Sequence, residues 1–369
     1  MRGTFATLPL RKSPSSGALA QKRHHRVELE GPVKRTYEWF KHRINEYDAE
    51  RASNNGKLAR HDWWRYAYYK SPYLILESNE AIVERFTDIF TNSLDISSDG
   101  KITPTPMMEN DHRLARLFTE IIEETNWRGV LHKDSMSNAK EQLNAYFENG
   151  TPIGVKLLDG VSDDSENILF KFSKSQYVQD MYNEGRFRIS PASYYSKGSH
   201  LRAVRDLETI RSYKLKGINE VINGSGTFNF QGNDIEIQNG VVPIQFEVGN
   251  YFLFSTCQRV SRRMPTDFDS DAVLIIHDKE SFLEKMKLEL EISWPDWEFL
   301  EREVYYYDPY NDLPTDRDQE FYKHFSYAYQ REHRCIVRPR QNAKAASRLE
   351  PFFVELGPLS GIAEMRKTS

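Results

Sequence analysis

The sequence is poor in cysteine and in long apolar runs. Its two cysteines, Cys257 and Cys335, are too few for a disulfide framework or for a cysteine-based zinc site. Apolar runs such as 251–254 and 272–276 fall far short of the roughly 18 residues that a membrane-spanning helix needs. The basic residues near the N-terminus are not followed by the apolar segment of a secretory signal. These absences favour a soluble protein of a reducing cytoplasm.

An excess of charge of one sign is also absent. The chain has 50 Lys and Arg against 54 Asp and Glu, a formal net charge of −4. This balance lacks the broad basic signature of a dedicated nucleic-acid-binding protein. No Gly-x-Gly-x-x-Gly follows a strand-like run and no Gly-x-x-x-x-Gly-Lys-Ser/Thr is present, which excludes Rossmann and P-loop sites at the level of motifs.

What the sequence does contain is two halves with different periodicity. With 369 residues the chain has the length of two domains, and we expect a flexible arm at 1–25, a helical module at 26–150 and a catalytic domain at 151–369. In the module, Tyr37, Phe40, Ile44 and Tyr47 recur at spacings of three and four, as in an amphipathic helix. Further stripes predict helices around 82–90, 114–122 (ended by Gly129) and 137–147.

One aromatic run in the helical module, residues 63–69, has two interpretations. Aromatic side chains with charges between them can stack on nucleic-acid bases. In a helical segment they more often form the core, and we favour that interpretation. We expect the module to bind a partner or to regulate the second half.

After Pro152 the pattern becomes strand-like. Short β-branched or aromatic runs are bounded by Gly, Asn, Asp or Pro, and helices are expected only at 175–183, 201–214 and 278–290. Many short strands with few, unevenly placed helices predict an α+β fold. The expected strands are 168–172, 186–190, 226–230, 234–238, 241–248, 251–257, 272–276, 304–307, 334–338 and 351–356.

Three strand-associated features of the second half carry polar residues suited to chemistry. Lys171 lies in the first strand, Ser255 and Thr256 end a middle strand, and Gln330 and Glu332 precede a late one. Gln330 and Glu332, two residues apart, would lie on one face of an extended chain.

This order of features resembles the arginine-serine-glutamate branch of the ADP-ribosyltransferase family. The resemblance covers about 168–356 and implies an NAD-consuming transferase in which Glu332 is catalytic and Gln330 contacts the acceptor. It also implies that Lys171 binds a phosphate or ribose of NAD and that Ser255 and Thr256 support the nicotinamide pocket. Two residues depart from the family pattern: Lys171 stands where the branch has Arg, and Cys257 where Ser-Thr-Ser has its last Ser.

The resemblance extends to transferases of bacterial toxin-antitoxin and phage-defence systems. It implies NAD as substrate, a protein, RNA or DNA acceptor, and an antitoxin or chaperone as a possible partner. Tyr194 and Tyr195 could stack on the nicotinamide, and Arg205 or Arg202 could bind the pyrophosphate. The alternating charges of that helix-like stretch are also typical of a solvated helix face. A carboxylate at Glu332 would stabilise the positive charge that develops on the ribose, and Arg331 or Arg334 would favour its ionised form.

Two alternatives belong to other functional classes. A metal-dependent nuclease would use carboxylates as Mg²⁺ ligands, from the set Asp206, Glu208, Asp267, Asp269, Asp271 and Glu332. A non-catalytic interaction protein would use the helical module to bind its partner, and Glu332 would then be one member of a surface ion-pair cluster.

Overall fold

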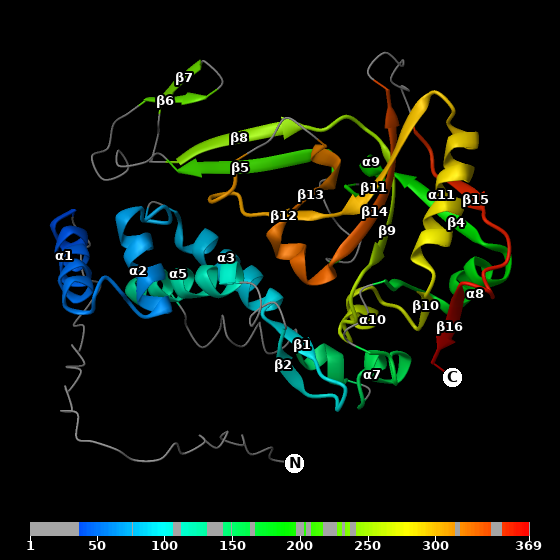
Figure 1. Cartoon of the computed structure of the whole chain (residues 1–369), viewed down its shortest axis with the longest axis horizontal. Helices are drawn as coiled ribbons and strands as arrows, with labels where there is room; N and C mark the ends of the chain where they lie inside the picture. The colour runs from blue at the N-terminus through cyan, green and yellow to red at the C-terminus, as the bar shows by residue number, and fades with distance from the viewer. Residues whose placement is uncertain are drawn as a thin grey trace. The chain divides into compact units, whose positions relative to one another are not determined.

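The structure is a computed structural model of the whole chain (Figure 1). All described residues belong to one compact unit, Arg35–Ser369. The predicted arm at 1–25 lies outside them, and the division at residue 150 into a module and a catalytic domain stays a prediction. The structure describes residues 37–75, 77–105, 112–130, 143–148, 150–162, 167–196, 203, 208–216, 227–230, 233–236, 241–313, 318–340 and 349–368.

The fold is α+β, with helices first and a β-rich region after them. Three of the four predicted N-terminal helices are confirmed, and the helix ending before Gly129 stops there because that residue has a left-handed φ of 62°. The fourth, at 137–147, lies mostly outside the described residues; its end is a short 3₁₀ turn, η1 (Ala145–Phe147). The long helices are α1 (Tyr37–Ser53), α2 (Arg60–Lys70), α3 (Asn79–Asn92) and α5 (His112–Arg128).

The tyrosines of the aromatic run at 63–69 lie in the core of the helical half, as predicted, whereas Trp63 is 47% exposed and Trp64 is half-buried. Tyr66, Tyr68 and Tyr69 are buried in α2. Their hydroxyls donate to carboxylates rather than facing solvent; for example, the Tyr68 hydroxyl lies 2.7 Å from Glu124 Oε2. Because these three rings and hydroxyls are engaged inside the protein, the tyrosines of the run are not available to stack on bases.

The second half is built on one large, mainly antiparallel sheet. Its path is β11-β14-β9-β3-β10-β16, and β4 pairs with both β9 and β15. Helices α8 (Ser175–Glu184) and α11 (Lys279–Ser293) cover one face with Val178, Met181, Phe282, Met286 and Leu290 (Figure 1). The strands are β3 (Leu169–Ser173), β4 (Arg186–Pro191), β9 (Phe252–Cys257), β10 (Ala272–Ile276), β11 (Trp297–Glu303), β14 (Glu332–Pro339), β15 (Phe352–Glu355) and β16 (Ala363–Lys367).

Smaller elements surround this sheet. Within the described residues, four strand pairs lie outside it: β1 (Leu94–Ile96) with β2 (Ile102–Pro104), β5 (Ile210–Lys216) with β8 (Val241–Glu247), β6 (Thr227–Phe230) with β7 (Asn233–Glu236), and β12 (Tyr305–Tyr307) with β13 (Tyr322–His324). The short helices are α7 (Ile153–Leu157), α9 (Ala192–Tyr195), α10 (Met264–Asp267), η2 (Gln319–Phe321) and η3 (Phe325–Gln330).

The predicted helix at 201–214 is wrong over its last part, which is the strand β5. Arg211 and Tyr213 are 2% and 1% exposed while Ser212 between them is exposed, so burial alternates with a period of two. Glu208, one of the charges expected on a solvated helix face, is instead buried and forms an ion pair with the buried Arg211. Residues 201, 202 and 204–207 lie outside the described part of the chain.

The segment that carries Gln330 and Glu332 is also not extended. Gln330 ends the 3₁₀ helix η3, and Glu332 begins β14. Arg331 between them has a φ of 46°, a left-handed conformation that is uncommon for a residue other than glycine. The chain therefore turns sharply before the strand starts.

Candidate active site

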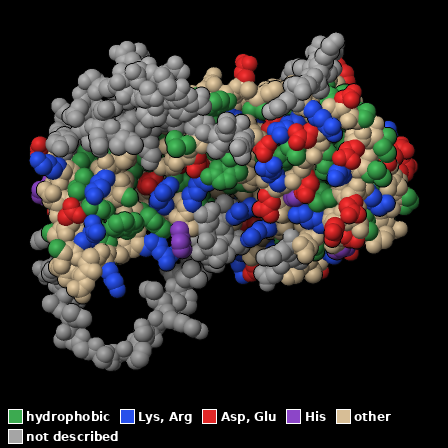
Figure 2. Space-filling model, turned by 45° about the horizontal axis from the view of Figure 1, so that its top comes forward, with side chains coloured by type: hydrophobic (Ala, Val, Ile, Leu, Met, Phe, Trp, Pro, Cys, Tyr) green, Lys and Arg blue, Asp and Glu red, His purple; other side chains and the backbone are tan. Residues whose placement is uncertain are grey.

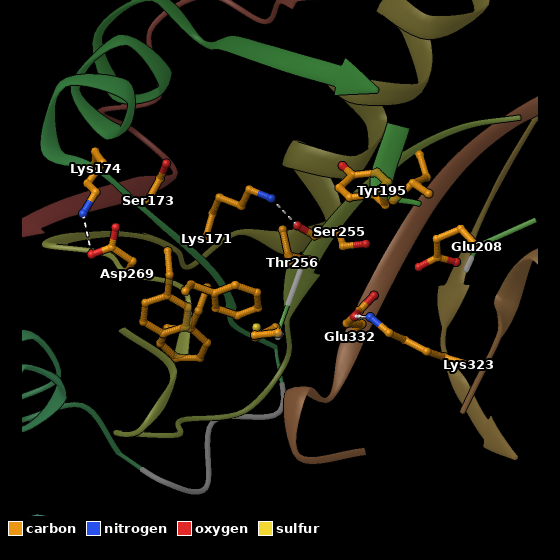
Figure 3. A pocket seen from close by; sticks show the side chains of 16 residues that line it. Lys171, Ser173, Lys174, Tyr195, Glu208, Ser255, Thr256, Asp269, Lys323 and Glu332 are labelled. Carbon is orange, nitrogen blue, oxygen red and sulfur yellow. Dashed lines mark hydrogen bonds and ion pairs between the residues drawn. The ribbon is translucent and has the colours of Figure 1, made fainter. Parts of the chain in front are cut away.

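A cavity of about 300 Å³ opens where β3, β9 and β14 lie next to one another (Figure 3). That volume is at the lower end for small-molecule pockets. The cavity brings together five of the seven predicted site residues: Lys171, Tyr195, Ser255, Thr256 and Glu332. Glu208, Lys323 and the aromatic residues Phe170, Phe172 and Phe268 complete much of its lining.

The register of the strands explains why these residues meet. Glu332 pairs with Cys257 across β14 and β9, and Cys257 pairs with Phe170 of β3. β14 stays paired with β9 up to Val337, whereas β3 pairs with β9 only through Phe170. The cavity lies where β3 and β9 are no longer hydrogen bonded to each other.

Lys171 spans this opening from β3. Its Nζ donates to the Ser255 carbonyl oxygen at 2.7 Å and lies 4.6 Å from the centroid of the Phe254 ring (Figure 3). Burial lowers the pKa of Lys171, an effect that the nearby Cys257 and Glu332 oppose. An ammonium group has three donors, so the contact with Ser255 leaves capacity for a ligand oxygen.

Glu332 is 6% exposed and forms ion pairs with two cations. Lys323 Nζ lies 2.5 Å from its Oε1, and Arg334 Nε lies 3.0 Å from its Oε2. Burial acts to raise the pKa of Glu332, but Lys323 and Arg334 outweigh it and lower the pKa to about 2. The carboxylate is therefore ionised at neutral pH.

A further carboxylate holds Arg334 in place from behind. Arg334 is fully buried and donates through both terminal nitrogens to Glu208, at 2.8 and 2.5 Å. Arg211 Nη2 and the Tyr251 hydroxyl each lie 3.3 Å from the same carboxylate. Burial acts to raise the pKa of Glu208, yet Arg334, Lys323 and Arg211 lower it. The expected role of Arg334 beside Glu332 is thus present, with a bidentate support that the sequence did not indicate.

Gln330 lies beneath the cavity rather than in its lining. It is 1% exposed, its Oε1 accepts from Lys323 Nζ at 2.9 Å, and its Nε2 donates to the Ala203 carbonyl oxygen at 2.8 Å. Lys323 therefore bridges Gln330 and Glu332. Contact between Gln330 and an acceptor stays a prediction.

The remaining predicted residues differ in position. The Ser255 side chain shares the Glu332 face of the sheet, because Ser255 pairs with Arg334, which lies two residues after Glu332. Thr256 is buried and its hydroxyl donates to the His333 carbonyl oxygen at 3.3 Å, a contact that supports the sheet. Tyr195, at the end of α9, is half-buried at the cavity wall. Arg205 lies outside the described residues.

Lys323 is the site residue that sequence reasoning missed altogether. It lies on β13 in the segment Tyr322–His324, where nothing in the spacing marks it. Glu208 had been considered only as a metal ligand. The one available signal for Lys323 was that a lysine flanked by aromatic residues in a short strand is poorly placed for solvent.

The carboxylates proposed as metal ligands do not converge in the described part of the chain. Asp267 pairs with Arg263, Asp269 with Lys174, and Asp271 accepts from the Ser175 backbone. Among the described residues no group of three or more His, Cys, Asp or Glu side chains could hold a metal ion. Asp206 lies outside those residues.

Neither the charges on the surface nor comparison with known proteins identifies what the cavity binds. On the described part of the face drawn in Figure 2, basic and acidic side chains are interspersed, without a continuous basic stripe. Within the described residues, no helix has the length and apolarity to span a membrane. Comparison with known protein families, curated proteins and solved structures finds no match for this chain.

Proposed function

We propose that the protein is a cytoplasmic ADP-ribosyltransferase that uses NAD as its substrate and Glu332 as its catalytic carboxylate. The observation that carries this proposal is the convergence of Lys171, Ser255 and Glu332 on one cavity from three neighbouring strands. These three residues are far apart in the sequence, yet they line the same cavity.

The basic groups at the cavity suit a ligand that contains a pyrophosphate dianion. The buried cluster beside the cavity contains three cations, Arg211, Lys323 and Arg334, and two carboxylates, Glu208 and Glu332. Lys171 adds a further basic group at the opening. In the lining itself Lys171, Lys174 and Lys323 balance Glu208, Asp269 and Glu332. The support for the pyrophosphate of NAD is therefore local: Lys171 would bind it as a point charge. The cavity of about 300 Å³ would hold the nicotinamide riboside part, with the rest of NAD along its mouth.

Glu332 supports the chemistry of nicotinamide loss. The bond between ribose C1′ and the nicotinamide nitrogen breaks, nicotinamide leaves with the electron pair, and positive charge develops on the ribose. An ionised, fixed carboxylate stabilises that charge, and its oxygens have lone pairs beyond those that Lys323 and Arg334 use. An acceptor oxygen or nitrogen then forms the new bond to C1′ and loses its proton to solvent.

The biological setting follows from the same resemblance. A toxin or phage-defence effector would modify a protein, RNA or DNA acceptor, and an antitoxin or chaperone would be its partner. The balanced charge of the described surface in Figure 2 gives no preference for a nucleic-acid acceptor.

The test combines NAD turnover with a matched pair of variants. Purified protein is incubated with NAD labelled on the adenylate phosphate and with separate pools of cell protein, RNA and DNA, while released nicotinamide is measured. Glu332→Gln should reduce release and transfer at least 100-fold. Glu298→Gln makes the same chemical change on β11, where Glu298 contacts Arg338 outside the cavity lining, and should keep full activity.

Three outcomes would contradict the proposal. Wild-type protein that releases no nicotinamide with any pool is not an NAD-consuming transferase. Biological activity that survives Glu332→Ala points to a non-catalytic interaction protein. Degradation of nucleic acid without NAD, stopped by chelation of Mg²⁺, points to a nuclease.

A further inference from the structure

One side chain of the helical half contacts both ends of the turn that leads to Glu332. Asn92, fully buried at the end of α3, accepts from the Tyr329 backbone N–H at 2.7 Å through Oδ1. Its Nδ2 donates to the Ser326 carbonyl oxygen at 3.2 Å and to the Asp88 carbonyl oxygen at 2.8 Å. The orientation of the amide is fixed by its partners, because a backbone N–H can only donate and a carbonyl can only accept.

The turn held by Asn92 sets the positions of Gln330 and Glu332. Ser326 and Tyr329 lie within η3, which ends at Gln330. Arg331 then takes its left-handed conformation, and the Glu332 backbone N–H donates to the Tyr306 hydroxyl at 2.8 Å. A non-glycine residue keeps such a conformation only when its surroundings impose it. Asn92 holds Tyr329 before Arg331 and Tyr306 holds Glu332 after it, while the Gln258 backbone N–H donates to the Arg331 carbonyl oxygen at 2.8 Å.

A second contact of α3 supports the Tyr306 side of the turn. Arg85 donates to both carboxylate oxygens of Asp308 at 3.0 and 2.8 Å, and Asp308 lies just after β12, the strand that carries Tyr306. Arg85 and Asn92 are seven residues apart, which is two helical turns, so they share one face of α3. Both are at most 5% exposed. These two polar residues on one buried face of α3 therefore contact the segment after β12 and the helix η3, which both pack around the turn before Glu332.

We propose that Asn92 is a positioning residue for catalysis, and that α3 is part of the active-site scaffold. This inference rests on the proposed function, since it concerns where Glu332 stands relative to NAD. It also changes the expected role of the helical half. Partner binding by this half stays a prediction, and α3 has the additional role of fixing the geometry of the turn 326–332.

The test compares variants of Asn92 with a matched control in the same half. Asn92→Ala removes both contacts to η3, and Asn92→Asp keeps the acceptor for Tyr329 but loses the donor to Ser326. Thr125→Val removes a fully buried hydroxyl of α5 that bonds only the Ile121 and Ile122 carbonyls of its own helix, among the contacts shown. All are assayed for nicotinamide release at a temperature where circular dichroism shows them folded.

The expected result separates positioning from stability. Both Asn92 variants should lower kcat on the order of 10- to 100-fold, because small misplacements of a catalytic group have effects of that size. KM for NAD should stay within about twofold, since the cavity lining from β3 and β9 is unchanged. Thr125→Val should leave kcat and KM unchanged even where it lowers the melting temperature.

Amide exchange provides a readout that does not depend on activity. In the wild-type protein the Tyr329 amide should exchange as slowly as amides within α3, and Asn92→Ala should accelerate it at least tenfold. Fast exchange of Tyr329 in the wild type would overturn the inference even if both variants fail to fold. An unchanged kcat in a folded Asn92→Ala variant would also overturn the inference about Asn92. If the wild-type protein is active in that experiment, the proposed function is unaffected. Wild-type protein that releases no nicotinamide refutes the proposed function, and the inference falls with it.

Discussion

Replacing Lys323 by Met tests the buried ion pair on which the site depends. The change keeps the length of the side chain and removes the charge that lies 2.5 Å from Glu332 Oε1 and 2.9 Å from Gln330 Oε1. Breaking a buried pair by removing one partner destabilises by about 3–5 kcal/mol, because the other charge is left uncompensated. Arg334 still donates to Glu332, so we expect the lower end, about 3 kcal/mol.

The depressed pKa of Glu332 gives a consistent magnitude and a direction with pH. A pKa lowered from 4.5 to about 2 corresponds to about 3 kcal/mol of folding free energy above pH 4.5. Because the folded-state pKa is the lower one, this stability is present at neutral pH and is lost as pH falls from about 4.5 towards 2. In Lys323→Met the pKa of Glu332 rises, so much of this pH dependence should disappear.

The assay is urea denaturation followed by tryptophan fluorescence at pH 7 and pH 3. The free energy of unfolding of Lys323→Met should lie about 3 kcal/mol below that of the wild type at pH 7, and the difference should shrink by about 2 kcal/mol at pH 3. Glu332→Gln and the double variant complete a double-mutant cycle, in which the coupling between Lys323 and Glu332 should also be about 3 kcal/mol. A coupling below about 0.5 kcal/mol, or a difference that does not depend on pH, would refute the ion pair as the cause.

Two further predictions concern packing and the cysteine at the cavity. Gly154→Ala should lower the free energy of unfolding by about 2 kcal/mol or more, because the new Cβ would lie 1.9 Å from the Arg262 carbonyl oxygen. Gly249→Ala is the control, since a Cβ there would have no atom within 4 Å. Its free energy of unfolding should stay within about 0.5 kcal/mol of the wild-type value in the same denaturation assay. Burial raises the pKa of Cys257 from 9.0 to about 12, so at pH 8 the folded protein should be alkylated there on the order of a thousandfold more slowly than in urea. Equal rates by mass spectrometry would contradict that environment.

Local signals in the sequence were sufficient for most elements around β3. The apolar run of β3 predicted a strand and the stripe of α8 predicted a helix, and a glycine just past a helix, here Gly185, is a general signal for its end. Gly185 does end α8 with a φ of 65°, and a Cβ there would also lie 2.2 Å from the Gly357 carbonyl oxygen. The left-handed turn could be predicted from the local sequence, whereas the close approach of Gly357 depends on the tertiary fold.

The prediction of a helix over 201–214 was wrong because the conformation of this segment also depends on tertiary contacts. Charges at helical spacing resembled a solvated helix face, but Arg211 is buried because Glu208, Arg334 and Glu332 form one network beside it. A buried arginine in a strand can be recognised only when its partners are known, and Arg334 lies 126 residues from Glu208 in the chain. Local periodicity in the sequence cannot reveal a contact between residues so far apart in the chain.

The same limit applies to the candidate site. The resemblance implied that Lys171, Ser255 and Glu332 belong to one site, and the sheet path β14-β9-β3 brings the strands that carry them together. Lys323 and Asn92 could not be predicted, because each acts through one side chain placed by tertiary contacts. The left-handed Arg331, which makes Gln330 and Glu332 converge on Lys323, also has no local signature such as glycine.

The surface ion-pair interpretation of Glu332 can be weighed against the energetics of burial. A solvent-exposed cluster would be of little consequence, but Glu332, Arg334 and Glu208 are at most 6% exposed. Replacing buried ion pairs by apolar side chains of similar volume is often neutral or stabilising, so such a network is weak evidence for a stability role. This network lies where the cavity meets β14, and the pKa values of both Glu332 and Glu208 are lowered. Buried charges with perturbed pKa values beside a cavity are the pattern of functional sites, which favours a role for Glu332 in chemistry over a role in folding.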